Sequence, residues 1–286
     1  TALVATAGIA SADVSISGAA TVGLLDTGAA GADSEMVQTM SATATMSGAT
    51  DGGLTFGASL AIRNGDDLDL DAGDLTNSGA LSATSFGSVF VSGDFGTITF
   101  DRDGIDNLMD DGSSSHDISY AYSVGDLSVA ATASVGDVTE TALGDDWSLS
   151  VAYAMAPATI TLKTDDEGET DVTVAYVVSD ALALSLNLDS DGGQTTADSE
   201  TTVTATYTAG ALTASLSLMD HDEDQWAASL GYTSGALTVA AALGELGADG
   251  DTEMDLSASY DLGGGMSIKG ATNETGAWFV GTALAF

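Results

Sequence analysis

Few side chains in this sequence are suited to covalent or acid–base chemistry. The chain has no cysteine, no Gly-x-Ser-x-Gly motif and two histidines, His116 and His221. Ser115, His116 and Asp117 are consecutive, and consecutive residues of a strand point to opposite faces, so these three are unable to form a catalytic triad. Without thiols, disulfides and thiolate metal sites are excluded. The sequence therefore predicts a protein that is not an enzyme.

Carboxylates are the abundant chemical groups. Four Lys and Arg residues stand against 43 Asp and Glu residues, a formal net charge of −39 that repels phosphates and excludes nucleic acid as a partner. Asp67, Asp69 and Asp71 offer the hard oxygen ligands that Ca²⁺ prefers, although Gly73 falls one position later than in a dedicated calcium loop. We predict that these carboxylates belong to a solvated acidic rim and that the protein has no cofactor. The alternative is a Ca²⁺ site at these three carboxylates.

The elements that carry these residues are predicted to be strands. Hydrophobic residues make up 44% of the chain, yet no apolar run of about 18 residues is present that could cross a bilayer as a helix. Apolar residues alternate with Ser, Thr and Ala from residue 13 onward, for example over residues 182–189. Lys, Arg and Glu, which usually cover a solvated sheet, are rare on the polar face. Small polar residues suit the lumen of a barrel whose apolar face meets lipid.

The connections between the predicted strands alternate in length. Short connections, such as 123–126 and 208–210, alternate with longer acidic ones, such as 64–83, 103–116 and 190–200. Short turns at one rim and long loops at the other are typical of an up-and-down membrane barrel. We therefore predict an all-β protein with one domain over residues 13–286, a transmembrane antiparallel up-and-down β-barrel of about 18 strands.

Aromatic residues are sorted between the two ends of the predicted strands. Six tyrosines each stand one to three residues before a short connection, namely Tyr122, Tyr153, Tyr176, Tyr207, Tyr232 and Tyr260. The three tryptophans, Trp147, Trp226 and Trp278, each follow a longer connection. Aromatic belts mark the two interfaces of a membrane barrel. We therefore predict a Tyr girdle at the short-turn rim and a Trp girdle at the loop rim.

Residues 1–12 read TALVATAGIASA, an apolar stretch that ends in an Ala-x-Ala motif. This pattern is typical of the second half of a secretory signal peptide, here without the initiating Met and the basic region. We predict residual signal peptide at residues 1–12. The alternative is a first strand or a disordered tail.

Several segments carry a resemblance to a known family. They are 13–18 (DVSISG), 46–60 (MSGATDGGLTFGASL), 87–100 (GSVFVSGDFGTITF), 259–268 (SYDLGGGMSI) and the terminal Phe286. The chain resembles the general porins of Gram-negative bacteria, particularly the acidic alphaproteobacterial type. The resemblance implies an outer-membrane channel for passive diffusion of small hydrophilic solutes and ions. It also implies a homotrimer, contact with outer-membrane lipid and lipopolysaccharide, and 16 strands as the alternative to 18.

In that family the third extracellular loop folds into the lumen. Residues 103–116 occupy its position and are fewer than the family usually has. The resemblance places the acids of the constriction at Asp101, Asp103, Asp106, Asp110 and Asp111. By alternation Arg63, Lys163 and Lys269 point into the lumen. Arg102 shares its parity with Ile98 and Phe100, so it needs a strand end or bulge to turn inward.

Because the chain has so few basic residues, the channel is predicted to pass cations in preference to anions. The alternative is that the four basic residues are rim charges paired with loop acids. Two other functions stay open. One is a substrate-specific, sugar-type outer-membrane channel, which would need aromatic residues along the lumen. The other is a secreted acidic β-rich surface or structural protein, which would be soluble without detergent.

Overall fold

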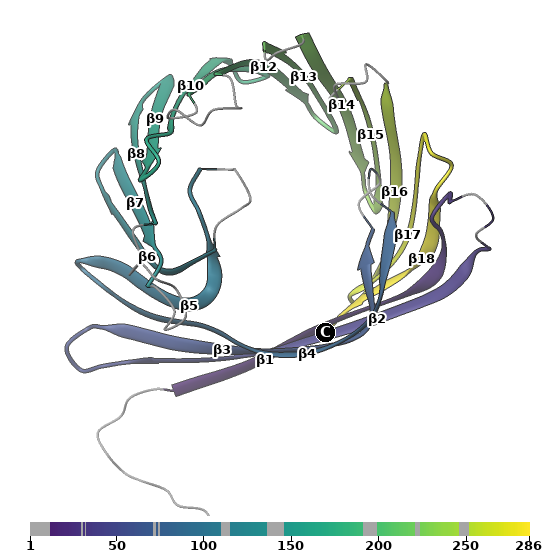
Figure 1. The fold of residues 1–286 in the computed structure, drawn as a ribbon, viewed down its shortest axis with the longest axis horizontal. Helices are drawn as coiled ribbons and strands as arrows, with labels where there is room; N and C mark the ends of the chain where they lie inside the picture. The colour runs from purple at the N-terminus through teal and green to yellow at the C-terminus, as the bar shows by residue number, and fades with distance from the viewer. Residues whose placement is uncertain are drawn as a thin grey trace, which may run out of the picture.

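The fold is a single closed sheet of strands. The computed structural model describes residues 12–29, 31, 33–70, 73, 75–109, 115–135, 146–190, 199–220, 224–245 and 252–286. Every strand pairs antiparallel with its neighbours in sequence, and β1 pairs with β18, so the 18 strands close into a barrel (Figure 1). In the described part of the chain, no helix is long and apolar enough to cross a membrane.

The strands have the following bounds: β1 (Ala12–Asp26), β2 (Glu35–Ala49), β3 (Thr55–Asp69), β4 (Thr76–Gly93), β5 (Gly96–Asp106), β6 (Ser115–Val124), β7 (Leu127–Ala133), β8 (Trp147–Met155), β9 (Ala158–Asp165), β10 (Thr170–Ser179), β11 (Leu182–Ser190), β12 (Glu200–Ala209), β13 (Leu212–Asp220), β14 (Asp224–Ser234), β15 (Leu237–Glu245), β16 (Glu253–Gly263), β17 (Met266–Asn273) and β18 (Trp278–Ala285). The predicted strand number of 18 is confirmed, and the alternative of 16 is wrong.

The sheet is apolar outside and polar inside. In β11, Leu184, Leu186 and Leu188 are exposed, whereas Ser185 and Asn187 line an internal pocket. In β1, Ile16 keeps 75% of its surface exposed. Alternation therefore separates a lipid-type face from a lumen face, as expected for a membrane barrel.

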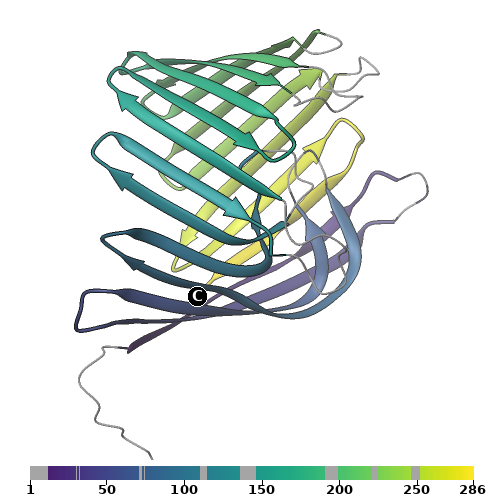
Figure 2. The ribbon, with the colours of Figure 1, turned by 60° about the vertical axis from the view of Figure 1, so that its left-hand side comes forward.

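The connections keep the predicted rhythm. Two-residue turns join β6 to β7, β12 to β13 and β14 to β15, and the longer connections lie at the other rim (Figure 2). Gly125 and Gly235 stand in such turns with φ of 57° and 59°. A two-residue hairpin turn that matches the strand twist requires positive φ, which glycine adopts without steric cost.

Backbone pairing at the C-terminus helps to close the barrel. The N–H of Phe286 donates to the carbonyl of Gly18 at 2.8 Å, and the N–H of Gly18 donates to the carbonyl of Phe286 at 3.2 Å. These bonds continue the β1–β18 ladder to the last residue. A barrel has no free sheet edge, and the pairing removes the edge that the first and last strands would otherwise expose.

Three predicted segments have other bounds in the structure. Residues 64–83 read as a loop in the sequence, but β3 continues to Asp69 and β4 begins at Thr76. The alternation is interrupted there by a register shift between Asp66 and Leu68, while the backbone ladder continues.

The inward loop predicted at 103–116 starts later, because β5 runs to Asp106. β1 includes Ala12, the last residue assigned to the signal peptide. Residues 1–11 lie outside the described part of the chain.

The barrel lumen as candidate functional site

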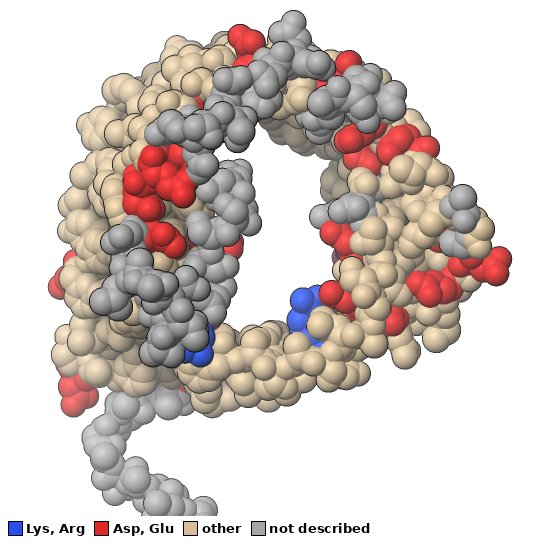
Figure 3. Space-filling view, in the orientation of Figure 1, with Lys and Arg blue, Asp and Glu red and all other residues tan. Residues whose placement is uncertain are grey.

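An opening runs through the centre of the barrel. In the space-filling view, Asp and Glu side chains gather on two sides of this opening, and the Lys and Arg atoms visible in the view lie at its lower edge (Figure 3). Two parts of the chain turn from the wall into the opening from opposite sides, the end of β5 on one side and the β3–β4 hairpin on the other (Figure 1).

The segment after β5 crosses the inside of the wall. The backbone N–H of Leu108 donates to Oγ of Ser148 in β8 at 3.0 Å. Met109 is 4% exposed and lines a pocket together with residues of β9–β12. The segment therefore lies inside the barrel, where the resemblance placed an inward loop.

A chain of buried hydrogen bonds supports this segment. His116 Nδ1 lies 2.6 Å from Thr132 Oγ1, and Thr132 Oγ1 lies 2.6 Å from Ser148 Oγ. His116, Thr132 and Ser148 are all nearly inaccessible to solvent. His116 thus bonds to β7, whereas its neighbour Asp117 accepts from the backbone N–H of Val135.

The inner wall of β9–β12 forms an acidic pocket of about 450 Å³. Lys163 forms an ion pair with Asp171, Nζ to Oδ2 3.2 Å. Asp171 is 7% exposed and also accepts from Thr173 at 3.0 Å and from Asn187 at 3.3 Å. Three further carboxylates line the same pocket: Glu169, Asp189 and Glu200. We call Lys163, Asp171, Glu169, Asp189 and Glu200 together the acidic pocket.

Two other basic residues are on the same polar face as Lys163. Arg63 in β3 pairs across the sheet with Ser41 and Ala83. Lys269 in β17 pairs with Ser259 and Gly281. Both positions agree with the alternation, which points these side chains to the lumen.

The structure does not group Arg102 with these three. Its exposed side chain lines a hollow with Phe86, Phe100 and Ile118, whose parity is outward. The register shift between Phe100 and Ile105 is the predicted type of irregularity, but it leaves Arg102 beside outward residues.

The acids assigned to the constriction are only partly described. Asp101 and Asp106 belong to β5, and a Cβ placed on Gly104 would lie 2.6 Å from the carboxyl carbon of Asp101. The backbone of Asp103 is in β5, but its side chain is outside the described part. Asp110 and Asp111 lie outside it entirely.

Calcium binding gains no support from the described residues. No three His, Asp or Glu side chains among them are placed to hold a metal ion. Asp67 and Asp69 are in β3, and Asp71 is outside the described residues. The calcium site stays a prediction.

The aromatic residues of the two predicted girdles stand near opposite ends of their strands. Tyr153, Tyr176, Tyr207, Tyr232 and Tyr260 are exposed near the short-turn ends of β8, β10, β12, β14 and β16, and Tyr122 stands near that end of β6. Trp147 and Trp278 open β8 and β18, and Trp226 is the third residue of β14.

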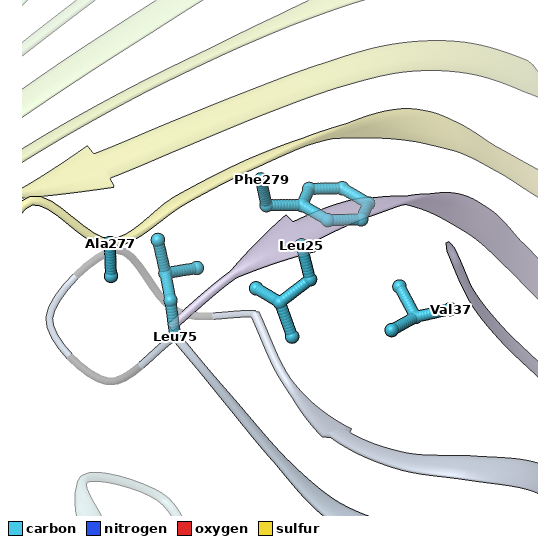
Figure 4. Close-up of a cluster of buried hydrophobic side chains, with 5 residues drawn as sticks. All are labelled: Leu25, Val37, Leu75, Ala277 and Phe279. Carbon is cyan, nitrogen blue, oxygen red and sulfur yellow. The ribbon is translucent and has the colours of Figure 1, made fainter. Parts of the chain in front are cut away.

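A cluster of apolar side chains in the lumen is absent from the sequence-based expectations. Leu25, Val37, Leu75, Ala277 and Phe279 are buried together at the loop end of the barrel (Figure 4). Leu25 and Phe279 are paired across β1 and β18 on the lumen face. The available signal is a break in alternation, because Leu25 follows Leu24 and Phe279 stands between Trp278 and Val280.

Comparison with known proteins gives a consistent result. The sequence model described as Gram-negative porin matches residues 1–276. No curated protein matches the sequence significantly. Among solved structures, one mutant of the Rhodopseudomonas blastica porin is 17% identical with a TM-score of 0.57, and another is 18% identical with a TM-score of 0.58. Each comparison covers 96% of this chain and 100% of the other. At this identity the structures support the fold.

Proposed function

The chain belongs to the Gram-negative porin family, and on that premise we propose that its lumen passes cations in preference to anions. Membership of the family makes the protein a channel for passive diffusion in the outer membrane, not an enzyme. The alternative of a secreted structural protein is therefore wrong. The charges that line the lumen determine which ions pass most readily.

The acidic pocket is the observation that carries the proposal. Among the described residues, four carboxylates and one ammonium group line it, and that ammonium group, on Lys163, pairs with Asp171 at 3.2 Å. Such groups create a negative potential, which the low-dielectric wall of a narrow passage focuses into the water-filled lumen, so cations are concentrated and anions are repelled. The effect acts over about 10 Å at 0.1 M salt, where the Debye length has that value.

The test is the zero-current potential in a planar bilayer under a tenfold KCl gradient, for which ideal cation selectivity gives about 59 mV. We expect the sign of K⁺ selectivity for the native protein and a smaller potential for the double variant Asp189→Asn/Glu200→Gln. The matched control is Asp180→Asn, which removes a carboxylate from the short turn between β10 and β11. An unchanged potential in the double variant, or a native potential of Cl⁻ sign, overturns the proposal.

We also propose a homotrimer that uses the outer face of β2 and β3. Gln38 and Asn64 are exposed there beside Val22, Met40 and Leu284. An amide side chain in hydrocarbon lacks hydrogen-bond partners, so polar groups on this face are better explained by a subunit contact than by lipid. Native mass spectrometry in detergent tests this: three copies are expected for the native chain and fewer for Gln38→Lys/Asn64→Lys. A native monomer refutes it.

Lipopolysaccharide is the proposed lipid partner at the loop rim, where Trp147, Trp226 and Trp278 lie. Tryptophan prefers the membrane–water interface. The measurement is lipopolysaccharide retained after purification, with native protein compared against Trp147→Ala. Equal retention by the two proteins speaks against a contact at this girdle.

A further inference from the structure

The loop-end part of the lumen contains apolar surface that water would otherwise contact. Leu25 in β1 and Val37 in β2 are 0% exposed, and Phe279 in β18 is 2% exposed. All three belong to the lumen face of their strands, because their neighbours Leu24, Met36 and Val280 are exposed on the outside. Apolar side chains are unfavourable in a water-filled passage unless another part of the chain covers them.

The far end of the β3–β4 hairpin is that cover. Leu75 is buried in the cluster, and Leu68 and Leu70 pack against it. We call Leu68, Leu70, Gly73 and Leu75 the β3–β4 tip. Figures 1 and 2 show the hairpin turning up along β16–β18, and Figure 4 shows Leu75 among Ala277, Leu25 and Phe279. Because the covered residues face the lumen, the tip lies within the channel.

Polar contacts fix where the β3–β4 tip lies. Asn273 Nδ2 in β17 donates to the carbonyl of Gly73 at 3.3 Å, across 200 residues of sequence. At the base of the tip, Asn77 Nδ2 donates to Glu35 Oε1 at 2.8 Å. The tip is therefore attached to both β2 and β17 and has one defined place on the wall.

Two glycines stand at an irregularity of the hairpin. Gly65 has φ of 120° and Gly79 has φ of 106°. Gly65 stands just before the register shift between Asp66 and Leu68, and Gly79 lies within that shift on β4. Positive φ favours glycine, and a bulge increases the local bend of a strand pair. The bend separates the part of the hairpin within the wall from the β3–β4 tip.

One group under the tip is left poorly satisfied by this arrangement. Asp255 Oδ1 in β16 is buried and has no hydrogen-bond partner among the residues that the structure describes. A Cβ on Gly73 would lie 3.3 Å from the other oxygen, Oδ2. A buried carboxylate oxygen without a partner is unfavourable. Movement of the tip away from the wall would return this oxygen to water. The burial of Asp255 Oδ1 therefore makes the docked position of the tip less favourable.

We propose that the β3–β4 tip sets the size limit of the pore opposite the segment after β5, and that its undocking gives a second, wider conductance state. Leu75 acts as the anchor through its burial against Leu25, Ala277 and Phe279. Asn273 positions the tip through Gly73. The readouts are pore size and conductance, so this proposal stands or falls independently of the cation preference.

The first experiment weakens the anchor without adding charge. Leu75→Asn is compared with Leu262→Asn, the same change in an exposed residue near the short turn of β16. Single-channel conductance in a planar bilayer and the largest sugar that passes in liposome swelling are measured. Leu75→Asn is expected to raise both, and Leu262→Asn neither. A folded Leu75→Asn barrel with native conductance and native size limit overturns the proposal.

The second experiment restores the docked state covalently. The chain has no cysteine, and position 73 lies close enough to Asp255 for a disulfide to join Gly73→Cys and Asp255→Cys. Combined with Leu75→Asn, the oxidised bond is expected to return conductance to the level of the Asp255→Cys single variant. Reduction is expected to restore the wide state. Equal conductance before and after reduction contradicts the role of the tip.

A third measurement covers the case in which Leu75→Asn does not fold. Gly73→Cys alone is treated with a thiol reagent that carries a bulky group during recording. The current is expected to fall stepwise, because the tip lies in the pore. The same treatment of Asp180→Cys, in a short turn, is expected to leave the current unchanged. Full current after labelling at position 73 refutes the proposal.

Discussion

Ser148→Ala tests how the segment after β5 is held inside the barrel. The substitution removes two hydrogen bonds at Oγ, one from Leu108 N–H at 3.0 Å and one with Thr132 Oγ1 at 2.6 Å. Of the two bonds, only the one from Leu108 joins the segment to the wall, because Thr132 and Ser148 both belong to wall strands. A buried donor left without a partner costs about 1–3 kcal/mol, so the docked position of the segment should become less stable by about that amount. That energy changes the equilibrium between docked and undocked segment by about 5- to 140-fold.

The assay is open-channel current noise in a planar bilayer, with the melting temperature of the barrel in detergent measured by circular dichroism. Ser148→Ala should increase the noise and the rate of transient closures while the barrel still forms. The matched control is Ser150→Ala, two residues further along the same face of β8. If the open-channel noise of Ser148→Ala equals that of Ser150→Ala and of the native protein, the hydrogen-bond chain through His116 does not hold this segment.

Three more predictions follow from single positions. Lys163→Gln removes the cation that pairs with Asp171 at 3.2 Å, so the zero-current potential in a KCl gradient should move further toward that of K⁺; a move toward Cl⁻ would show that the acidic pocket does not face the ion path. Gly281→Ala places a Cβ 2.5 Å from Phe279 Cζ and should destabilise the barrel by about 1–3 kcal/mol, whereas Gly270→Ala, with its nearest atom at 3.5 Å, should not; equal denaturant midpoints would contradict this. Deletion of Phe286 removes its two bonds with Gly18 and should reduce the yield of barrel inserted into liposomes; an unchanged yield would show that the seam closes without them.

The strands were predictable where one physical rule acts along the whole segment. In β11 the leucines alternate with Ser, Asn and Asp because lipid contacts one face and water the other, so its bounds of Leu182–Ser190 differ by one residue from those expected. The two-residue turns were predictable for a similar reason, since Gly125 and Gly235 supply the positive φ that such turns need.

The β3–β4 tip was not predictable from the same rule. The tip lies in the lumen, so neither of its sides contacts lipid and the apolar–polar alternation is not required there, and Asp66, Asp67 and Asp69 suggest a solvated loop. Leu75 meets Leu25 and Phe279 only through the closure of the barrel, and no local pattern encodes a contact across about 200 residues. The side-by-side apolar residues at 24–25 and 278–280 were the only local signal.

The constriction was partly predictable. Alternation placed Arg63, Lys163 and Lys269 on the lumen face, because that rule needs no partner. The side chain of Arg102 needs an irregularity in the strand to point inward, and the sequence does not specify how such an irregularity turns the side chain. The register shift in β5 leaves Arg102 beside Phe86, Phe100 and Ile118. In the sequence, His116 suggests only a possible catalytic role. His116 bonds to Thr132 in the neighbouring strand β7. This contact depends on the register between the two strands, which the sequence alone does not specify.

Single-channel recording of the purified native protein in a planar bilayer tests the central claim most directly. A porin with a water-filled lumen is expected to insert in discrete current steps, with a conductance that rises with the salt concentration of the bath. Absence of stepwise conductance from protein that is folded and inserted would contradict the account.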